Sequence, residues 1–160
     1  MKKSNNPKLQ MHTLRSVEVG DIKDLFEWNN HPLSRKNSLR SEPIAWEEHK
    51  RWFAERLTDA LTTIYILCSN KEKLGAVRFE EKENGVRISV MLNPDYIGKR
   101  LGTELIRLGT EQYVKEKKPG RPIFAEVKSD NLPSKKAFLK AGFQEKLTIY
   151  IYDKEVKPVD

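Results

Sequence analysis

The sequence predicts one domain of the α/β class, with a mixed and mostly antiparallel sheet flanked by helices. Apolar, β-branched runs alternate along the chain with segments whose apolar residues recur at helical spacing. One such run, residues 86–92, leads through a polar turn with two glycines into a helix near Leu101. The length of 160 residues, of which 38% are hydrophobic, suffices for one core, and no repeat or linker divides the chain.

The first half is expected to begin with an alternating strand and to contain two helices and two further strands. The first helix opens at Gly20-Asp21 and stops at residues 29–32, because the residue before Pro32 disfavours helical geometry. A polar loop is expected over residues 33–43, and Asn84-Gly85 is typical of a hairpin. The first strand, the second helix and the next two strands are expected at residues 11–17, 46–57, 64–68 and 74–79.

The second half is expected to contain crossover units, which place parallel strands beside the antiparallel ones. The long helix that starts near Leu101 ends before the chain-breaking residues 117–120. A short helix over residues 135–140 stops at Gly142. The strands of this half are expected at residues 86–92, 123–127 and 143–152.

The formal charge of +7 favours an anionic partner, either nucleic acid or a small molecule rich in phosphate. Nucleic acid is the weaker prediction, because neither a reading helix nor basic residues interleaved with aromatic ones are evident. The single cysteine, Cys68, excludes an internal disulfide and a cysteine-rich metal site, and we expect it to be buried and inert. Residues 1–10 form a polar lead-in without a signal sequence, and no apolar run is long enough for a membrane span, so we expect a cytoplasmic protein. We also expect that it binds no metal.

The turn over residues 93–105 has the features of a phosphate-binding element. A helix N-terminus offers unpaired N–H groups and the positive end of the helix dipole, and glycines let a phosphate approach the backbone. The turn lacks both the three-glycine dinucleotide fingerprint and the ending of a P-loop. A tight turn with close helix–strand packing therefore remains the alternative interpretation.

Two motifs on these elements resemble the GCN5-related N-acetyltransferase (GNAT) superfamily, and the resemblance spans residues 11–152. Residues 97–102 (IGKRLG) are similar to the pattern Arg/Gln-x-x-Gly-x-Gly/Ala, with Ile97 and Arg100 as departures. Residues 131–143 (NLPSKKAFLKAGF) are similar to Asn-x-x-Ser-x-x-x-Tyr-x-Lys-x-Gly-Phe, with Phe138 in place of the tyrosine. The resemblance implies acetyl-coenzyme A as co-substrate and a sheet splayed at the cofactor strand.

The resemblance also assigns residues to the cofactor. Main-chain groups of Met91 and Leu92 are expected to bind the pantetheine arm, and Asn131 the amide region beside it. Lys135 or Lys136 is expected to meet the phosphates, unless both are merely solvated. The residues expected around the pyrophosphate are Gly98, Lys99, Arg100, Gly102 and Thr103.

The N-terminal third resembles N-acetyltransferases of nucleotide-linked amino-sugar pathways, such as those leading to pseudaminic-type acids. The similarity lies in WxNxPxxRxxS from Trp28, in EHxxWF from Glu48 and in GAVRFE from Gly75. It implies that Asn30 and Arg35 contact the acceptor and that Arg78 pairs with a substrate diphosphate, although a cross-strand salt bridge is the alternative for Arg78. We expect a monomer or a homodimer.

The catalytic residues are the least defined part of the prediction. Phe138 cannot donate the proton that the family's tyrosine supplies, so Ser134, Tyr96, Tyr150 or a water molecule is expected to replace it. His49, Glu80 and Glu126 are the candidates for the base, and a core position is the commoner role of a histidine like His49.

Three other functions stay open at this point. Acetylation of a protein N-terminus or a ribosomal protein is the alternative within the fold. A non-catalytic acyl-coenzyme A-binding module is the alternative from another class, because the usual tyrosine and glutamate are absent. Binding of nucleic acid is the third.

Overall fold

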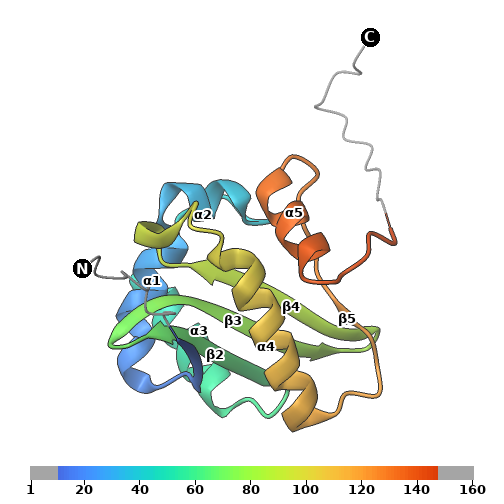
Figure 1. Cartoon of the computed structure of the whole chain (residues 1–160). Coiled ribbons are helices and arrows are strands. Elements are labelled where there is room, and N and C mark those ends of the chain that lie inside the picture. Colours follow the sequence, from blue (N-terminus) through green and yellow to red (C-terminus); the bar gives the residue numbers. More distant parts are fainter. Residues whose placement is uncertain (1–10, 148–160) are drawn as a thin grey trace, which may run out of the picture.

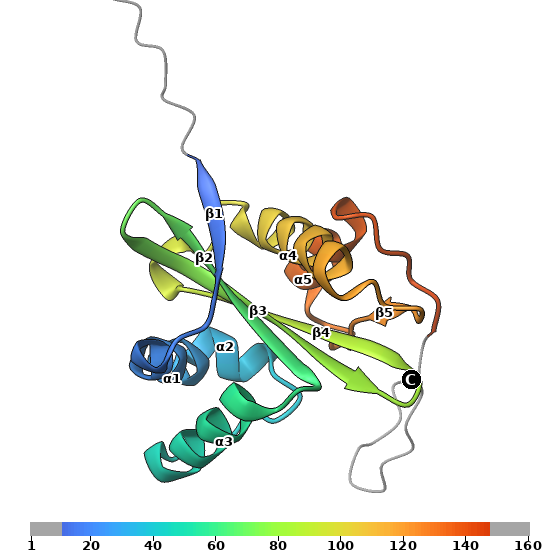
Figure 2. The same ribbon diagram turned by 90° about the horizontal axis from the view of Figure 1, so that it is seen from below.

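The computed structural model describes residues 11–147 as a five-stranded sheet with helices on both faces. Figure 2 shows the first three helices on one face of the sheet and the last two on the other. The strands are β1 (His12–Ser16), β2 (Thr62–Ser69), β3 (Glu72–Lys82), β4 (Gly85–Leu92) and β5 (Ile123–Phe124). The helices are α1 (Ile22–Asn30), α2 (Pro32–Asn37), α3 (Trp46–Thr58), α4 (Leu101–Lys117) and α5 (Leu132–Lys140). Two 3-10 turns, η1 (Val19–Asp21) and η2 (Pro94–Tyr96), precede α1 and α4.

The strands lie in the order of the sequence, from β1 to β5. Neighbouring strands run antiparallel except β4 and β5, which run parallel because α4 crosses over between them. The predicted mixed, mostly antiparallel sheet is therefore confirmed. No helix within residues 11–147 has the length and apolar character needed to cross a membrane.

The core has two parts, one on each face of the sheet. On one face, α4 and α5 cover the larger cluster, which is centred on Val77, Leu105 and Tyr113. On the other face, α1 and α3 cover a smaller cluster with Trp28 and Phe53. Side chains alternate between these clusters along β4 and along β3 from Ala76 onwards, as the period of two in a strand requires. The register shift between β2 and β3 at Leu67/Cys68 interrupts the alternation, and Leu74 joins the larger cluster.

The structure differs from the predicted elements in a few segments, and α5 begins at Leu132 rather than at residue 135. The loop expected over residues 33–43 contains α2, because Pro32 sits in its first turn and the His31 side chain accepts a hydrogen bond from Leu33 N. The strand expected over 123–127 ends at Phe124, where β5 leaves β4. Residues 143–147 form no strand, and the rest of the expected last strand lies outside the described residues. Cys68 is half-buried rather than buried.

Candidate active site

The turn after β4 leads into α4, as the sequence predicts, through two residues in left-handed conformations. Gly98 and Arg100 both adopt positive φ angles, of 84° and 63°. Arg100 is the N-cap of α4 and makes no side-chain capping bond, so the first N–H groups of this 17-residue helix remain free for a ligand. Lys99 is exposed and lies over the Tyr96 ring, with its Nζ 4.5 Å from the ring centroid. Gly102 and Thr103 belong to the first turn of α4, where the dipole is positive.

The second feature is an open edge on β4. β5 pairs with β4 only at Val86 and Arg87, although β4 continues to Leu92. The opposite edge of β4 stays in register with β3 along its whole length. Figure 1 shows the chain turning away from β4 after β5 towards α5. The result is a wedge between two diverging strands, in which backbone groups of β4 have no strand partner among residues 11–147.

The register of β3 and β4 identifies these groups. Asn93 N donates to Leu74 O of β3 (2.9 Å), whereas Val86 N donates to Pro122 O on the opposite side (2.9 Å). Because successive residues of a strand direct their N–H and C=O groups to alternate edges, Val90 and Leu92 face the wedge. Met91 faces β3, and its carbonyl oxygen lies 2.6 Å from the point where a Cβ on Gly75 would stand. The main-chain role predicted for Met91 is therefore wrong, because its groups face β3. The role predicted for Leu92 stays a prediction, and its main-chain groups face the wedge, as do those of Val90.

The start of α5 lies on the side of the wedge opposite β4. Asn131 is buried, and its Oδ1 caps the helix by accepting from Ser134 N (3.3 Å). Ser134 is half-buried in the first turn, and Lys136 is exposed beside it. Phe138 lies in the core with its ring edge-on to Phe143, so its position offers no polar group.

Two predicted acceptor contacts, Asn30 and Arg35, serve the protein's own backbone. The Asn30 side chain makes two hydrogen bonds to the main chain of Ile44 (2.8 and 3.0 Å). All five N–H groups of Arg35 are used: they bind Asn29, Ser38 and the carbonyls of residues 40 and 42. Burial lowers the pKa of the Arg35 guanidinium. Both residues hold the segment between α2 and α3 in place, and the guanidinium of Arg35 has no N–H group left for a substrate.

His49 is a core residue. It is 1% exposed, and its Nε2 lies 2.8 Å from Ile22 O, so Nε2 carries the proton. The rings of Phe26, Trp46 and Phe53 surround it. Burial lowers the pKa of His49, against a smaller opposite effect of the hydrogen bond. A histidine enclosed in this way has no path to a substrate amine, so the prediction of His49 as base is wrong.

Glu80 is buried on the face of the sheet that α3 covers, and four cationic side chains converge on it. Its carboxylate lies 2.7 Å from Arg87 Nη2, 3.3 Å from Arg78 Nε, 3.7 Å from Lys82 Nζ and 3.9 Å from Arg56 Nη2. Burial alone raises the pKa of Glu80, but Arg78 and Arg87 outweigh it, and the pKa lies below its usual value. Glu126, the third candidate base, is half-exposed and lies 3.4 Å from Arg87 Nη1.

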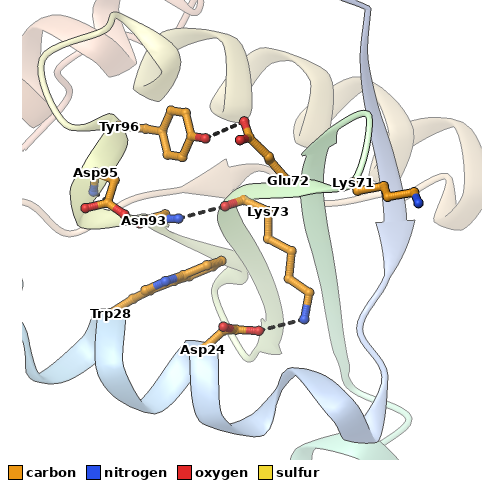
Figure 3. Close-up of a pocket in the computed structure, with 8 residues that line it drawn as sticks. All are labelled: Asp24, Trp28, Lys71, Glu72, Lys73, Asn93, Asp95 and Tyr96. Atoms are coloured by element: carbon orange, nitrogen blue, oxygen red, sulfur yellow. Dashed lines mark hydrogen bonds and ion pairs between the residues drawn. The ribbon is translucent and has the colours of Figure 1, made fainter.

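A polar cleft of about 370 Å³ lies beside the turn, between α1, the β2–β3 hairpin and η2. Figure 3 shows Trp28 at one side of it and Tyr96 at another, with Lys73 between Asp24 and the strand. Three of its charged groups have partners within it: Lys73 Nζ lies 2.6 Å from Asp24, and Tyr96 donates to Glu72. This hydrogen bond raises the pKa of Tyr96. Of the predicted catalytic groups, the cleft holds only Tyr96, which thus faces away from the wedge towards Glu72. Tyr150 lies outside the described residues.

Two parts of the site escaped sequence analysis. Arg56 and Arg87 come from different elements, and no motif links them to Glu80. The second part is the edge of β4 that the Val90 N–H faces. This edge depends on the register of the hairpin that begins at Asn84-Gly85, and counting residues from that turn along β4 would have identified it.

The comparisons with known proteins agree with this fold. The sequence profile of the acetyltransferase (GNAT) domain family matches residues 12–144. An uncharacterized protein of Methanocaldococcus jannaschii, MJ1062, is 25% identical over 138 residues, which are 82% of this chain but 28% of that protein. The chain thus spans less than a third of the length of this relative.

Solved structures share the fold. Spermidine N-acetyltransferase from Vibrio cholerae, solved with CoA and spermine, superposes with a TM-score of 0.75 at 19% identity, over 84% of this chain and 82% of that one. Aminoglycoside acetyltransferase AAC(6')-Ib, solved with coenzyme A, gives 0.73 at 22% identity, over 87% of each chain. A domain from Methanocaldococcus jannaschii gives 0.71 at 23% identity, over 85% and 90%.

Proposed function

Because the chain belongs to the acetyltransferase (GNAT) domain family, we propose that it transfers the acetyl group of acetyl-CoA to an amino group on a nucleotide-linked sugar. The observation that carries the transferase part is the wedge beside β4, which opens directly onto the turn before α4. This arrangement offers a strand edge for an extended amide chain and a helix N-terminus for its pyrophosphate.

The chain's own groups supply the elements of acyl transfer. N–H groups in the first turn of α4 bind the pyrophosphate, with Lys99 and Lys136 near its charge. Leu92 main-chain groups and the Asn131 amide hold the pantetheine arm. Val90 N–H donates to the thioester oxygen, where negative charge develops as the acceptor nitrogen forms its bond to the carbonyl carbon.

The C–S bond then breaks, and the sulfur leaves as a thiolate that takes up one proton while the nitrogen loses one. Ser134, at the start of α5, is the described hydroxyl that we assign to the proton donor. Thiolates are good leaving groups, since a cysteine thiol already ionises near pH 8.5, so the step does not require the acidity of a tyrosine.

The acceptor assignment rests on two supports. The first is the resemblance of the N-terminal third to amino-sugar N-acetyltransferases. The second is Arg78, whose guanidinium carbon lies 5.2 Å from the centroid of the half-buried Trp52 ring. A cation beside an aromatic surface suits a phosphorylated, ring-containing acceptor. The spermine and kanamycin of the structural neighbours are polycations and do not share this chemistry.

A thiol-release assay with four acceptors tests the proposal: a UDP-linked amino sugar, spermidine, kanamycin and a peptide with a free N-terminus. We expect acetyl-CoA-dependent release that is fastest with the UDP-linked amine. Preference for spermidine, kanamycin or the peptide would overturn the acceptor. A thermal shift with acetyl-CoA but no release with any amine would identify a binding module. Absence of both responses would refute the acetyl-CoA site itself.

A further inference from the structure

Glu80 collects more positive charge than a structural ion pair requires. It lies within ion-pair distance of Arg56, Arg78, Lys82 and Arg87. Asp59 and Glu126 also contact this group, through Arg56 and Arg87. Four cations thus share three carboxylates, and only Glu80 is fully buried among them. The surplus charge is available to an anion from solution.

The four cations do not use Glu80 equally. Arg87 donates to it from both Nε and Nη2 (3.3 and 2.7 Å). Arg78 approaches it without a hydrogen bond, and its buried Nε has no hydrogen-bond partner within residues 11–147. An unpartnered donor in a buried position is costly, and a ligand that accepts from it removes that cost. Arg78 also keeps 26% of its side chain exposed, so a ligand can reach it.

The strand register places Arg78 next to the reaction centre. Arg78 is paired with Ser89 across β3 and β4, and Ser89 precedes Val90, whose N–H faces the wedge. Side chains at 78, 80 and 87 project from the same face, the one that α3 covers, because 78 pairs with 89 and 80 with 87. An acceptor approaching Val90 from this face therefore meets the two guanidinium groups.

We propose that Arg78 and Arg87 form the subsite for a phosphate group of the acceptor, and that Glu80 is the positioning residue that aligns them. This inference rests on the acetyltransferase function proposed above. It replaces the role of general base that the sequence suggested for Glu80. A carboxylate held between guanidinium groups is a poor proton acceptor. Its two hydrogen bonds fix the plane of the Arg87 guanidinium, and its charge draws Arg78 to 3.3 Å, beside the Trp52 ring.

The test compares the UDP-linked amino sugar with the same free amino sugar in the wild type and in Arg78→Gln and Glu80→Gln. Arg107→Gln is the matched control, since this exposed arginine on α4 pairs only with Glu111 among the residues described. In Arg78→Gln we expect kcat/KM for the UDP-linked acceptor to fall about 10- to 100-fold. The KM for acetyl-CoA and the rate with the free sugar should change less than about twofold.

Glu80→Gln separates the two roles of that residue. As a positioning residue it raises the KM for the UDP-linked acceptor and leaves the shape of the pH–rate profile unchanged. Loss of the acidic limb of that profile, with kcat lower by about 10²- to 10⁴-fold, would show a general base and overturn the proposal. The thermal shift caused by UDP alone, which should vanish in Arg78→Gln, gives a second readout that needs no turnover.

The outcomes also separate this inference from the proposed function. Turnover with equal kcat/KM for the charged and the free sugar would overturn the phosphate subsite alone. Absence of turnover with every amine would overturn the function, and then an unchanged UDP shift in Arg78→Gln would overturn the subsite as well.

Discussion

Replacement of Arg100 by glycine should stabilise the protein and preserve its affinity for acetyl-CoA. Arg100 is a non-glycine residue at φ 63° and ψ 10°, in the left-handed region. A side chain costs about 1–2 kcal/mol there, which glycine avoids. Glycine loses about 0.4–1 kcal/mol through the greater freedom of the unfolded chain. The difference is a gain of about 0.5–1 kcal/mol, or a Tm rise of about 1–4 °C for a domain of this size.

The same helix offers a matched control. Lys118 caps the C-terminus of α4 at φ 47° and ψ 54°, so Lys118→Gly should give a similar Tm rise at the end far from the turn. Calorimetry measures the stability of both variants, and isothermal titration measures their acetyl-CoA affinity. If Arg100 contributes only its backbone N–H, both variants bind within about threefold of the wild type, a difference under 1 kcal/mol.

Two results would refute this reasoning. A lower Tm for Arg100→Gly would mean that the left-handed conformation is not a source of strain. Affinity weaker by about tenfold or more, with Lys118→Gly unaffected, would mean that the Arg100 side chain itself binds the phosphates.

Three further predictions concern the scaffold. Asp21→Asn should destabilise the fold by about 3 kcal/mol in chemical denaturation, because it leaves two cationic partners of a 1%-exposed carboxylate uncompensated. Burial raises the pKa of Asp21, but these cations outweigh it and hold the pKa well below its usual value. The stabilisation that the Asp21 carboxylate provides is therefore present at neutral pH and is lost as the pH falls below about 4. A variant whose stability falls with acid as steeply as that of the wild type would contradict this. Gly109→Ala should lower the free energy of unfolding by about 1–3 kcal/mol despite the better helix propensity of alanine, because the new Cβ would stand 2.6 Å from Val77 Cγ1. Adding Val77→Ala should recover part of this loss. A double mutant whose two effects simply add would exclude this contact as the cause. Arg35→Lys should speed trypsin cleavage after Arg40 several-fold, since lysine has three donors for the five that are used; unchanged cleavage would show that other contacts hold the segment.

The elements that the sequence predicts correctly are those set by local chemistry. The turn with Gly98 and the hairpin at Asn84-Gly85 depend on residues within a few positions, and both occur where expected. The helix expected over residues 135–140 also occurs, but it begins earlier, at Leu132, where Asn131 caps it. α2 was missed because a polar composition masked a proline-initiated turn. The strand at 123–127 was predicted too long because local propensity carries no information on where a partner strand diverges.

The candidate site shows the same division. The places of Leu92 on the β4 edge and of Gly102 in the first turn of α4 follow from motif and register, and their contacts with a cofactor stay predictions. Contacts made through tertiary packing do not follow from motif and register: His49 fills the core and Arg35 ties down a loop, although both are polar residues in a motif that suggested substrate contact. Polarity in a motif does not distinguish a contact with substrate from a contact with the backbone. Only the partners found in the fold make this distinction.

Amide-resolved hydrogen exchange by NMR, with and without acetyl-CoA, tests the central claim that the open edge of β4 receives the co-substrate. The account predicts that exchange of the Val90 and Leu92 amides slows when acetyl-CoA is added. Met91, whose N–H already faces β3, serves as the internal control and should stay protected in both states. Binding of acetyl-CoA with unchanged exchange at Val90 and Leu92 would contradict the account, because the arm would then lie elsewhere.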